Sequence, residues 1–186
     1  RWPDVSLTLQ SALPEAVLRQ RIARPFACVA GVADFVMVMV DALQAKIPES
    51  LAAYRSFHRE WDARLAWQEQ LLRVAAPDGV LADIPYLSLA AAKPLGISTL
   101  ALCSLNWADI LAGYGADAMD LAELRAPMVT AYNSAIAFLQ PAPSMPMPDL
   151  QNGAPIGPIA ALGQYRRSEI DRQLGLAQGT TVVLMA

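Results

Sequence analysis

The sequence predicts an α/β fold, with a parallel sheet flanked by helices. Short apolar runs alternate along the chain with segments of helical spacing. Residues 80–82 and 98–103 read as two strands, and the Ala- and Leu-rich segment 86–93 between them reads as a helix that ends at Pro-Leu-Gly. The second strand lacks alternation, as expected when both of its faces are buried. Strand, helix and strand form a βαβ unit, so the two strands should run parallel, adjacent or one strand apart.

Shorter elements are predicted in the first quarter of the chain. Residues 5–11 alternate between apolar and polar as a strand does. A helix over 14–20 begins at a proline, and the apolar run 25–30 is a second strand. The Val-rich stretch 32–43 stays open between a strand and a loop that packs on the core.

The middle of the chain is mainly helical by pattern. Over 48–74, aromatic residues and leucines recur near helical spacing with charged residues between them, which predicts one long helix. The Pro-Asp-Gly turn at 77–79 ends it. Residues 107–114 and 120–135 are two further predicted helices, and 137–140 is a short strand.

The last part of the chain changes character. Residues 141–160 are dense in proline, cannot hold a helix, and are predicted to be an extended interdomain linker. A helix over 166–176 and a strand over 180–186 follow. We therefore divide the chain into a domain over 1–140, the linker, and the start of a second domain over 161–186, and we expect both ends to be truncated.

Composition excludes several classes of function. Of the 186 residues, 55% are hydrophobic, so a sizeable core can form. The 14 basic and 17 acidic residues include no run of Lys or Arg, which excludes a nucleic-acid footprint. Cys28 and Cys103 lie in apolar runs, typical of buried thiols, and a single histidine gives no metal cluster. Such thiols favour a reducing, cytoplasmic setting. No apolar stretch can span a bilayer, and no signal-peptide pattern is present.

Polar residues follow both strands of the βαβ unit. Asp83 comes directly after the first strand, and Ser104, Asn106 and Trp107 come directly after the second. Ligands of open parallel sheets bind beyond the carboxyl ends of the strands. Because neighbouring strands lie about 4.8 Å apart, we expect these side chains within roughly 10 Å of one another at one edge of the sheet.

Each candidate also has a purely structural interpretation. Asp83 could simply cap the next helix, and Asn106 with Trp107 could be a helix cap and a packed indole. His58, the only histidine, sits in the middle of a helix and is expected to pack or to face solvent rather than to catalyse. The sequence has no Gly-rich phosphate loop, no nucleophile elbow, no zinc-protease motif and no Cys-x-x-Cys pair. By itself it predicts a nucleotide-fold-like domain with an acid at the sheet edge.

The stretch GVLADIPYLSLAAAKPLGISTLALCSLNWADIL, residues 79–111, resembles the N-terminal domains of GT-B glycosyltransferases. The shared pattern is an Asp at a strand end, a helix of small residues, a Leu-Gly-Ile turn, a strand, and an Asn near a Trp. The stretch is similar in particular to bacterial glycosyltransferase-like proteins and to the N-terminal domain of L-arabinokinases. Those proteins have Ser where this chain has Ala82, and they separate the Asn from the Trp, which are adjacent here. The resemblance extends to RWPDVSLTLQSALP at the start and to GPI and RRSEIDRQLGL later.

The resemblance implies a Rossmann-like parallel sheet, the N-terminal half of a GT-B fold, followed by the start of a second such domain. It also implies a first strand and a Gly-His-Gly-type loop upstream of Arg1. The histidine of that loop would act as the base, and Asp83 would orient it. His58 lies in the wrong element to replace it, so this chain alone is expected to be inactive.

The implied activity is the transfer of a sugar from a nucleotide-sugar donor to an acceptor hydroxyl, with no metal and no other cofactor. Ser104, Asn106 and Trp107 would bind substrate. Apolar walls and the Trp107 indole suit a flat or lipid-like acceptor, and with it a peripheral contact with a membrane. Two alternatives stay open. One is a non-catalytic sugar- or ligand-binding module, and the other is an accessory domain of a sugar kinase or isomerase.

Overall fold

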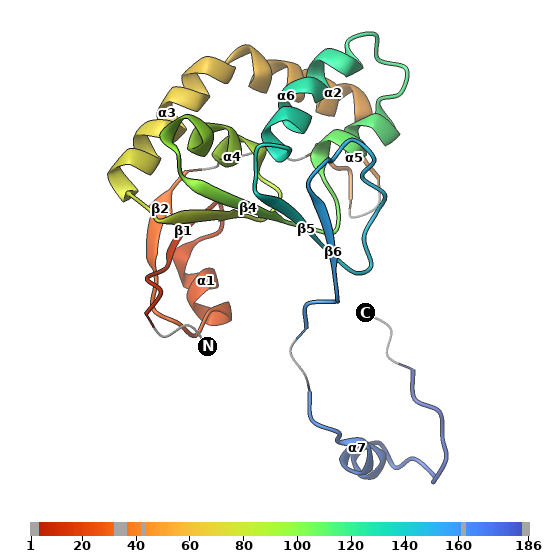
Figure 1. Ribbon diagram of the computed structural model, residues 1–186. Helices are drawn as coiled ribbons and strands as arrows, with labels where there is room; N and C mark the ends of the chain where they lie inside the picture. Colours follow the sequence, from red (N-terminus) through yellow and green to blue (C-terminus); the bar gives the residue numbers. More distant parts are fainter. Residues whose placement is uncertain (1–3, 32–36, 42–43, 161–162, 184–186) are drawn as a thin grey trace.

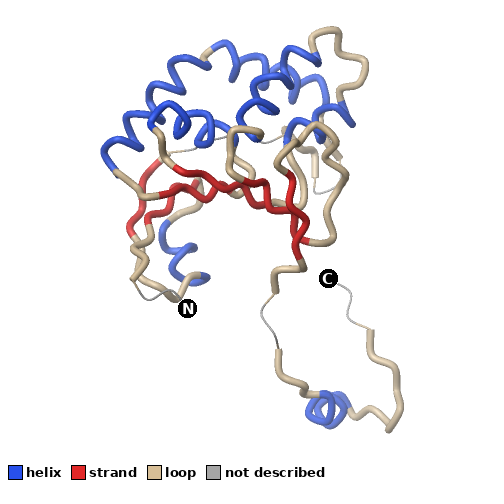
Figure 2. The backbone as a smooth tube through the Cα atoms, in the orientation of Figure 1, coloured by secondary structure: helices blue, strands red, loops and turns tan. Residues whose placement is uncertain are grey.

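The computed structural model describes residues 4–31, 37–41, 44–160 and 163–183, and within them two parallel sheets form (Figures 1 and 2). The smaller sheet pairs β1 (Thr8–Ser11) with β2 (Ala27–Ala30). In spatial order, the strands of the larger sheet are β3 (Gly79–Ala82), β4 (Ser98–Leu102), β5 (Ala137–Pro141) and β6 (Gly153–Ile156). All neighbouring strands in both sheets are parallel.

Helices flank these strands. They are α1 (Glu15–Arg21), α2 (Ile47–Arg59), α3 (Trp61–Ala75), α4 (Tyr86–Ala92), α5 (Trp107–Tyr114), α6 (Leu121–Tyr132) and α7 (Arg167–Leu174), with a 3-10 turn at Lys93–Leu95. In Figure 1, α2, α3, α4 and α6 lie above the larger sheet, α1 lies below the smaller one, and α7 stands apart from both. The predicted fold class is therefore confirmed. Among the helices of the described ranges, none is long and apolar enough to cross a membrane.

The predicted βαβ unit is present. β3 and β4 are adjacent and parallel, in a register that runs from Gly79 opposite Ser98 to Ala82 opposite Ala101. The connecting helix α4 packs on both strands. Since the two strands are in register, their carboxyl ends reach the same edge of the sheet.

One face of the larger sheet is the floor of the core. Ala82, Ala101 and Phe138 are register partners, so their side chains point to the same face, and they are 4%, 0% and 0% exposed. The helices above this face contribute fully buried residues, among them Leu89 of α4 and Met128 of α6. The alanines of β3 and β4 leave room for α4 to approach the strands closely.

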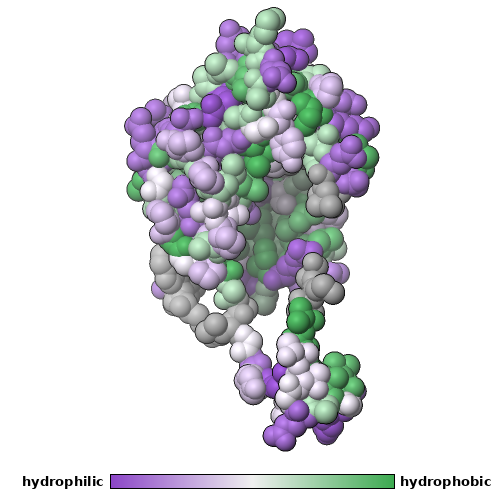
Figure 3. Space-filling view, turned by 90° about the vertical axis from the view of Figure 1, so that its right-hand side faces the viewer, coloured by the Kyte–Doolittle hydropathy of each residue, from purple (hydrophilic) through white to green (hydrophobic). Residues whose placement is uncertain are grey.

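The opposite face of the same sheet carries leucines. Leu81 is opposite Leu100 and Leu102 is opposite Leu139, so all four point away from the helix-covered face. Leu81 is 62% exposed, and the other three are half-buried. Figure 3 views the molecule from the right-hand side of Figure 1 and shows a hollow with hydrophobic residues along it.

A buried polar link joins the smaller sheet to the helices. The side-chain amides of Gln10 in β1 and Gln68 in α3 exchange two hydrogen bonds, of 2.9 and 2.8 Å. The Gln68 amide also donates to the hydroxyl of Ser88 in α4, at 3.4 Å. Gln68 is 0% exposed, so these bonds satisfy an amide that could not otherwise be buried without a large cost.

The long helix predicted over 48–74 is two helices. Glu60 is not helical, with φ −96° and ψ 13°, and it both ends α2 and begins α3. The sequence offers neither glycine nor proline at that point, so its apolar spacing alone could not show the break. Phe57 and Trp61, on either side of it, both contact the ring of Tyr86.

The expectation of an extended linker over 141–160 does not hold for Gly153–Ile156, which form β6 and pair with β5. Proline is compatible with this strand because β6 is the edge of the sheet, where an N–H is not needed on the open side. The preceding loop buries Met147, which is 8% exposed. The domain division itself stays a prediction.

Two further expectations concern segments that are partly outside the described residues. Within 32–43, the described part forms only an isolated antiparallel bridge between Met39 and Ala45, so it is a loop rather than a strand. At the C-terminal end, Thr180–Val183 are not in a strand, and residues 184–186 lie outside the described residues.

The two faces of the sheet should respond differently to truncation. Leu89→Ala removes a side chain that is 0% exposed and should lower the free energy of unfolding by about 2–5 kcal/mol. Leu81→Ala, at 62% exposure, should cost less than about 1 kcal/mol. Urea unfolding of both variants measures the difference. Equal losses would show that Leu81 is covered in solution.

Candidate functional site

The candidate site is the edge of the larger sheet where β3 and β4 end. We call the segments Asp83–Pro85 and Cys103–Trp107, which follow these two strands, the rim. Asp83 is exposed, and the half-buried Ser104 follows the neighbouring strand, so the predicted placement of these two residues at one edge is confirmed. Their roles as catalytic support and substrate ligand stay predictions.

Cys103 is the first residue after β4, as Asp83 is the first after β3. Burial raises the pKa of the Cys103 thiol, and the nearby Asp83 carboxylate raises it further, against the opposing effect of the Leu105 and Ser104 backbone N–H groups. Sequence reasoning assigned Cys103 no role, although it follows β4 as Asp83 follows β3. Cys28, also predicted to be buried, is exposed on the edge strand β2, and both thiols are free.

The residue after Asp83 has an uncommon backbone conformation. Ile84 has a φ of +70°, in the left-handed region that β-branched residues rarely adopt. Such a conformation costs on the order of 1–3 kcal/mol and persists only where the surroundings hold it. Here the hydroxyl of Tyr132 donates a 2.8 Å hydrogen bond to the Ile84 carbonyl. The same hydroxyl accepts a 3.3 Å hydrogen bond from the backbone N–H of Trp107. One phenol therefore joins the two segments of the rim.

Asn106 serves as the cap of α5. Its side-chain oxygen accepts from the backbone N–H of Asp109 at 2.9 Å, and its amide donates to the Asp109 carboxylate at 2.7 Å. Arg125 binds the same carboxylate at 2.8 Å and also Asp149 at 2.7 Å. Asn106 is 0% exposed with both amide atoms engaged, so this geometry favours the helix-cap interpretation over substrate binding.

Trp107 is half-buried at the start of α5. Its indole nitrogen is buried and has no hydrogen-bond partner among the described residues. An indole N–H is a donor only, and its burial leaves no surface through which a ligand could contact it in this conformation. Of the three predicted substrate ligands, Asn106 is engaged in the cap, and the roles of Ser104 and Trp107 stay predictions.

His58 is held within an aromatic cluster. Its Nε2 lies 2.9 Å from the hydroxyl of Tyr86, and its ring makes an edge contact with Trp61 at 5.7 Å between centroids. Its Nδ1 is buried and has no hydrogen-bond partner in the described part of the chain. Burial lowers the pKa of His58. The hydrogen bond to Tyr86, rather than to Asp83, agrees with the prediction that His58 packs.

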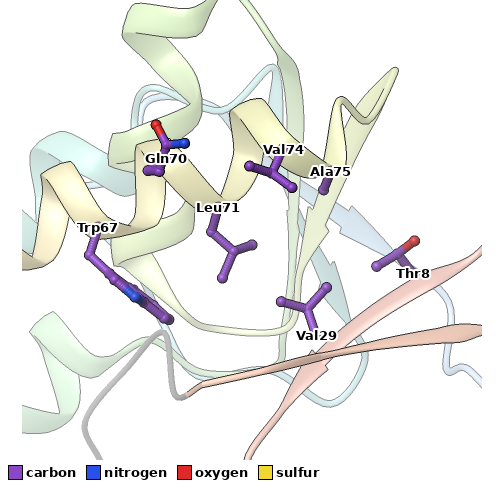
Figure 4. A pocket seen from close by; sticks show the side chains of 7 residues that line it. All are labelled: Thr8, Val29, Trp67, Gln70, Leu71, Val74 and Ala75. Atoms are coloured by element: carbon purple, nitrogen blue, oxygen red, sulfur yellow. The ribbon is translucent and has the colours of Figure 1, made fainter.

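The cavities lie elsewhere. A groove of about 350 Å³ runs between α3 and the strands β1 and β2 (Figure 4). Its lining residues are Thr8, Val29, Trp67, Gln70, Leu71, Val74 and Ala75. Beside it, Gly31 has a φ of +130°, and a Cβ there would lie 2.4 Å from the Trp67 ring. A second groove of about 310 Å³ lies among α3, α4 and α6. Neither groove is lined by a predicted site residue.

Among the described residues, no group of three or more His, Cys, Asp or Glu side chains could hold a metal ion. Comparison with known proteins adds no identification, since no family model, no curated protein and no solved structure matches this chain. The fold class therefore stands on the sheet topology, and the family resemblance stays a hypothesis.

Stability should depend on the protonation of His58. Its folded-state pKa is below the ordinary value of 6.5, so the unfolded chain binds the proton more readily. The free energy of unfolding should therefore fall as the pH drops below about 6.5, and above that pH the effect disappears. His58→Gln removes this contribution and should flatten the curve between pH 7 and pH 5. If the free energy of unfolding falls with pH equally in the wild type and in His58→Gln, the predicted contribution of His58 is wrong.

The cap of α5 should contribute measurably to stability. Asn106→Ala removes both bonds to Asp109 and should lower the free energy of unfolding by about 1–2 kcal/mol. Asn106→Ser keeps an acceptor at the cap and should cost less. Thermal unfolding followed by circular dichroism compares the two. If Asn106→Ala unfolds at the same temperature as the wild type, the cap of α5 does not contribute measurably to stability.

Proposed function

We propose that this chain is the acceptor-side domain of a glycosyltransferase that uses a nucleotide-sugar donor. The observation that carries the proposal is an exposed carboxylate, Asp83, at the carboxyl end of a parallel strand, where ligands of such sheets bind. The residue that follows it, Ile84, has a strained backbone, a feature that clusters at functional sites. The resemblance of residues 79–111 to GT-B N-terminal domains supports the same assignment.

In the proposed reaction, Asp83 acts through an imidazole. A carboxylate that holds one ring nitrogen of a histidine raises the basicity of the other. The imidazole then takes the proton of the acceptor hydroxyl, whose oxygen bonds to the sugar carbon as the bond to the nucleotide diphosphate breaks. His58 bonds to Tyr86, so the base would be a histidine of another segment, which the resemblance assigns to a loop upstream of Arg1.

Substrate contacts would come from the rest of the rim. The half-buried indole of Trp107 offers an apolar surface suited to the ring of a sugar or to a flat, lipid-like acceptor. Ser104 would add a hydroxyl from the same segment of the rim. The donor nucleotide would bind mainly to a second domain, of which residues 161–186 would be the beginning.

A non-catalytic sugar-binding module is the second candidate. It is favoured by one observation, that His58, the single histidine of the sequence, bonds to Tyr86 and not to Asp83. A carboxylate without an imidazole partner can still accept hydrogen bonds from sugar hydroxyls with its lone pairs. Such a module would bind sugars through the same rim without transferring them.

A matched pair of substitutions tests the catalytic role. Asp83 and Asp78 are exposed acids that directly follow and directly precede the same strand, β3. In the full-length polypeptide that contains this sequence, Asp83→Asn should lower the rate of sugar transfer from labelled UDP-, GDP- or TDP-sugars by a factor on the order of 10²–10⁴. The amide keeps the shape of the side chain but not the charge that stabilises an imidazolium. Asp78→Asn should leave the rate unchanged.

Two results separate the candidates. An Asp83→Asn protein with the transfer rate of the wild type would overturn the proposed role of Asp83. If the full-length polypeptide transfers and hydrolyses none of the donors, but NMR titration with monosaccharides shifts the rim resonances, the binding module replaces the glycosyltransferase.

A further inference from the structure

We propose that Tyr132 is the positioning residue of the rim, and that its hydroxyl holds the Asp83 carboxylate in place by fixing the backbone of Ile84. The inference goes beyond the proposed function, because it concerns the geometry of the rim whether or not a sugar is transferred there.

Tyr132 reaches both segments of the rim from a third element. It is the last residue of α6 and is 0% exposed. Its hydroxyl donates to the Ile84 carbonyl after β3 and accepts from the Trp107 N–H at the start of α5. Since a hydroxyl has one proton to donate, this arrangement uses its donor on one segment and an acceptor lone pair on the other.

The ring of Tyr132 is itself fixed. It makes edge contacts with Tyr86 of α4, at 6.0 Å between centroids, and with Phe138 of β5, at 5.3 Å. Phe138 is fully buried in the floor of the core. The hydroxyl is therefore carried by a ring that packing holds in one position, which a surface tyrosine could not provide.

The hydroxyl stabilises a conformation that Ile84 would otherwise leave. At a φ of +70°, the branched side chain of Ile84 crowds its own backbone, so this residue should relax toward negative φ without the bond to its carbonyl. Asp83 is its covalent neighbour and the first residue after β3. A rotation at Ile84 would therefore move the Asp83 carboxylate relative to the strand end.

Cys103 reports the position of Asp83 without any substrate. Burial raises the pKa of this thiol, and the nearby carboxylate of Asp83 raises it further. Removal of the carboxylate, or its displacement, should lower the pKa of Cys103. The thiolate is the reactive form, so the pH dependence of alkylation measures that pKa.

The test is the pH–rate profile of Cys103 alkylation by iodoacetamide, followed by mass spectrometry in a Cys28→Ser background. Asp83→Asn sets the size of the downward shift when the charge is absent. Tyr132→Phe should shift the midpoint in the same direction. Tyr86→Phe is the matched control, because Tyr86 is equally buried and loses a hydroxyl that bonds to His58 instead. Its midpoint should stay at the wild-type value.

A glycine at position 84 distinguishes a positioning role of the Tyr132 hydroxyl from a nonspecific loss of packing. Glycine adopts positive φ without strain, so the rim should keep its conformation without the phenol. Ile84→Gly combined with Tyr132→Phe should therefore return the midpoint of Cys103 toward wild type. The double variant should also fold if Tyr132→Phe alone does not. An unshifted midpoint in a folded Tyr132→Phe protein, or a double variant that fails to fold or stays shifted, overturns the proposal.

The outcome is independent of the proposed activity. If Tyr132→Phe shifts the Cys103 midpoint while the full-length Asp83→Asn protein transfers sugar normally, the positioning role stands and the catalytic role of Asp83 fails. If the Cys103 midpoint does not shift but Asp83→Asn strongly lowers transfer, the positioning role of Tyr132 fails and the catalytic role of Asp83 stands.

Discussion

The close packing of α4 on β3 and β4 is the contact on which the rest of the structure depends. Ala82 and Ala101 present only methyl groups to the helix, and Ala91 and Ala92 of α4 are themselves 0% exposed. The chain has three residues between the end of β3 and the start of α4 in which to reverse direction. A connection this short gives the backbone few options, and within it Ile84 is left-handed with its carbonyl hydrogen-bonded by the Tyr132 hydroxyl. The tight core and the rim therefore meet in these three residues.

The helices around α4 are tied together by aromatic rings. Tyr86, at the first position of α4, stacks on Trp61 of α3 and makes edge contacts with Phe57 of α2 and Tyr132 of α6. Edge and offset contacts of this kind add to the free energy of burial and fix ring orientation. The ring of Tyr132 therefore contacts α4 directly through Tyr86, and Tyr86 in turn is packed against α2 and α3. Hydrogen bonds through Gln68 attach the smaller sheet to the same assembly.

Two acids beside the strand ends differ in their electrostatic surroundings. Asp109 is bound by Arg125 and by Asn106, so its charge is compensated within the fold. Asp83 is exposed and takes part in none of the ion pairs among the described residues. Within the part of the chain that the structure describes, the charge of Asp83 therefore has no such partner, and this difference underlies the choice of Asp83 over Asp109 in the proposed function.

The sequence by itself determined the class of fold. The apolar runs at 80–82 and 98–103 are too short for helices, the small-residue segment between them has helical spacing, and such a unit has parallel strands at one edge of a sheet. That placed Asp83 and Ser104 correctly, because strand ends follow from local pattern. Only the tertiary structure showed that Asn106 is a buried cap, that Pro155 lies in an edge strand, and that the Tyr132 hydroxyl bonds to both segments of the rim. These depend on contacts between residues distant along the chain, such as Tyr132 with Ile84, and no local pattern carries that information.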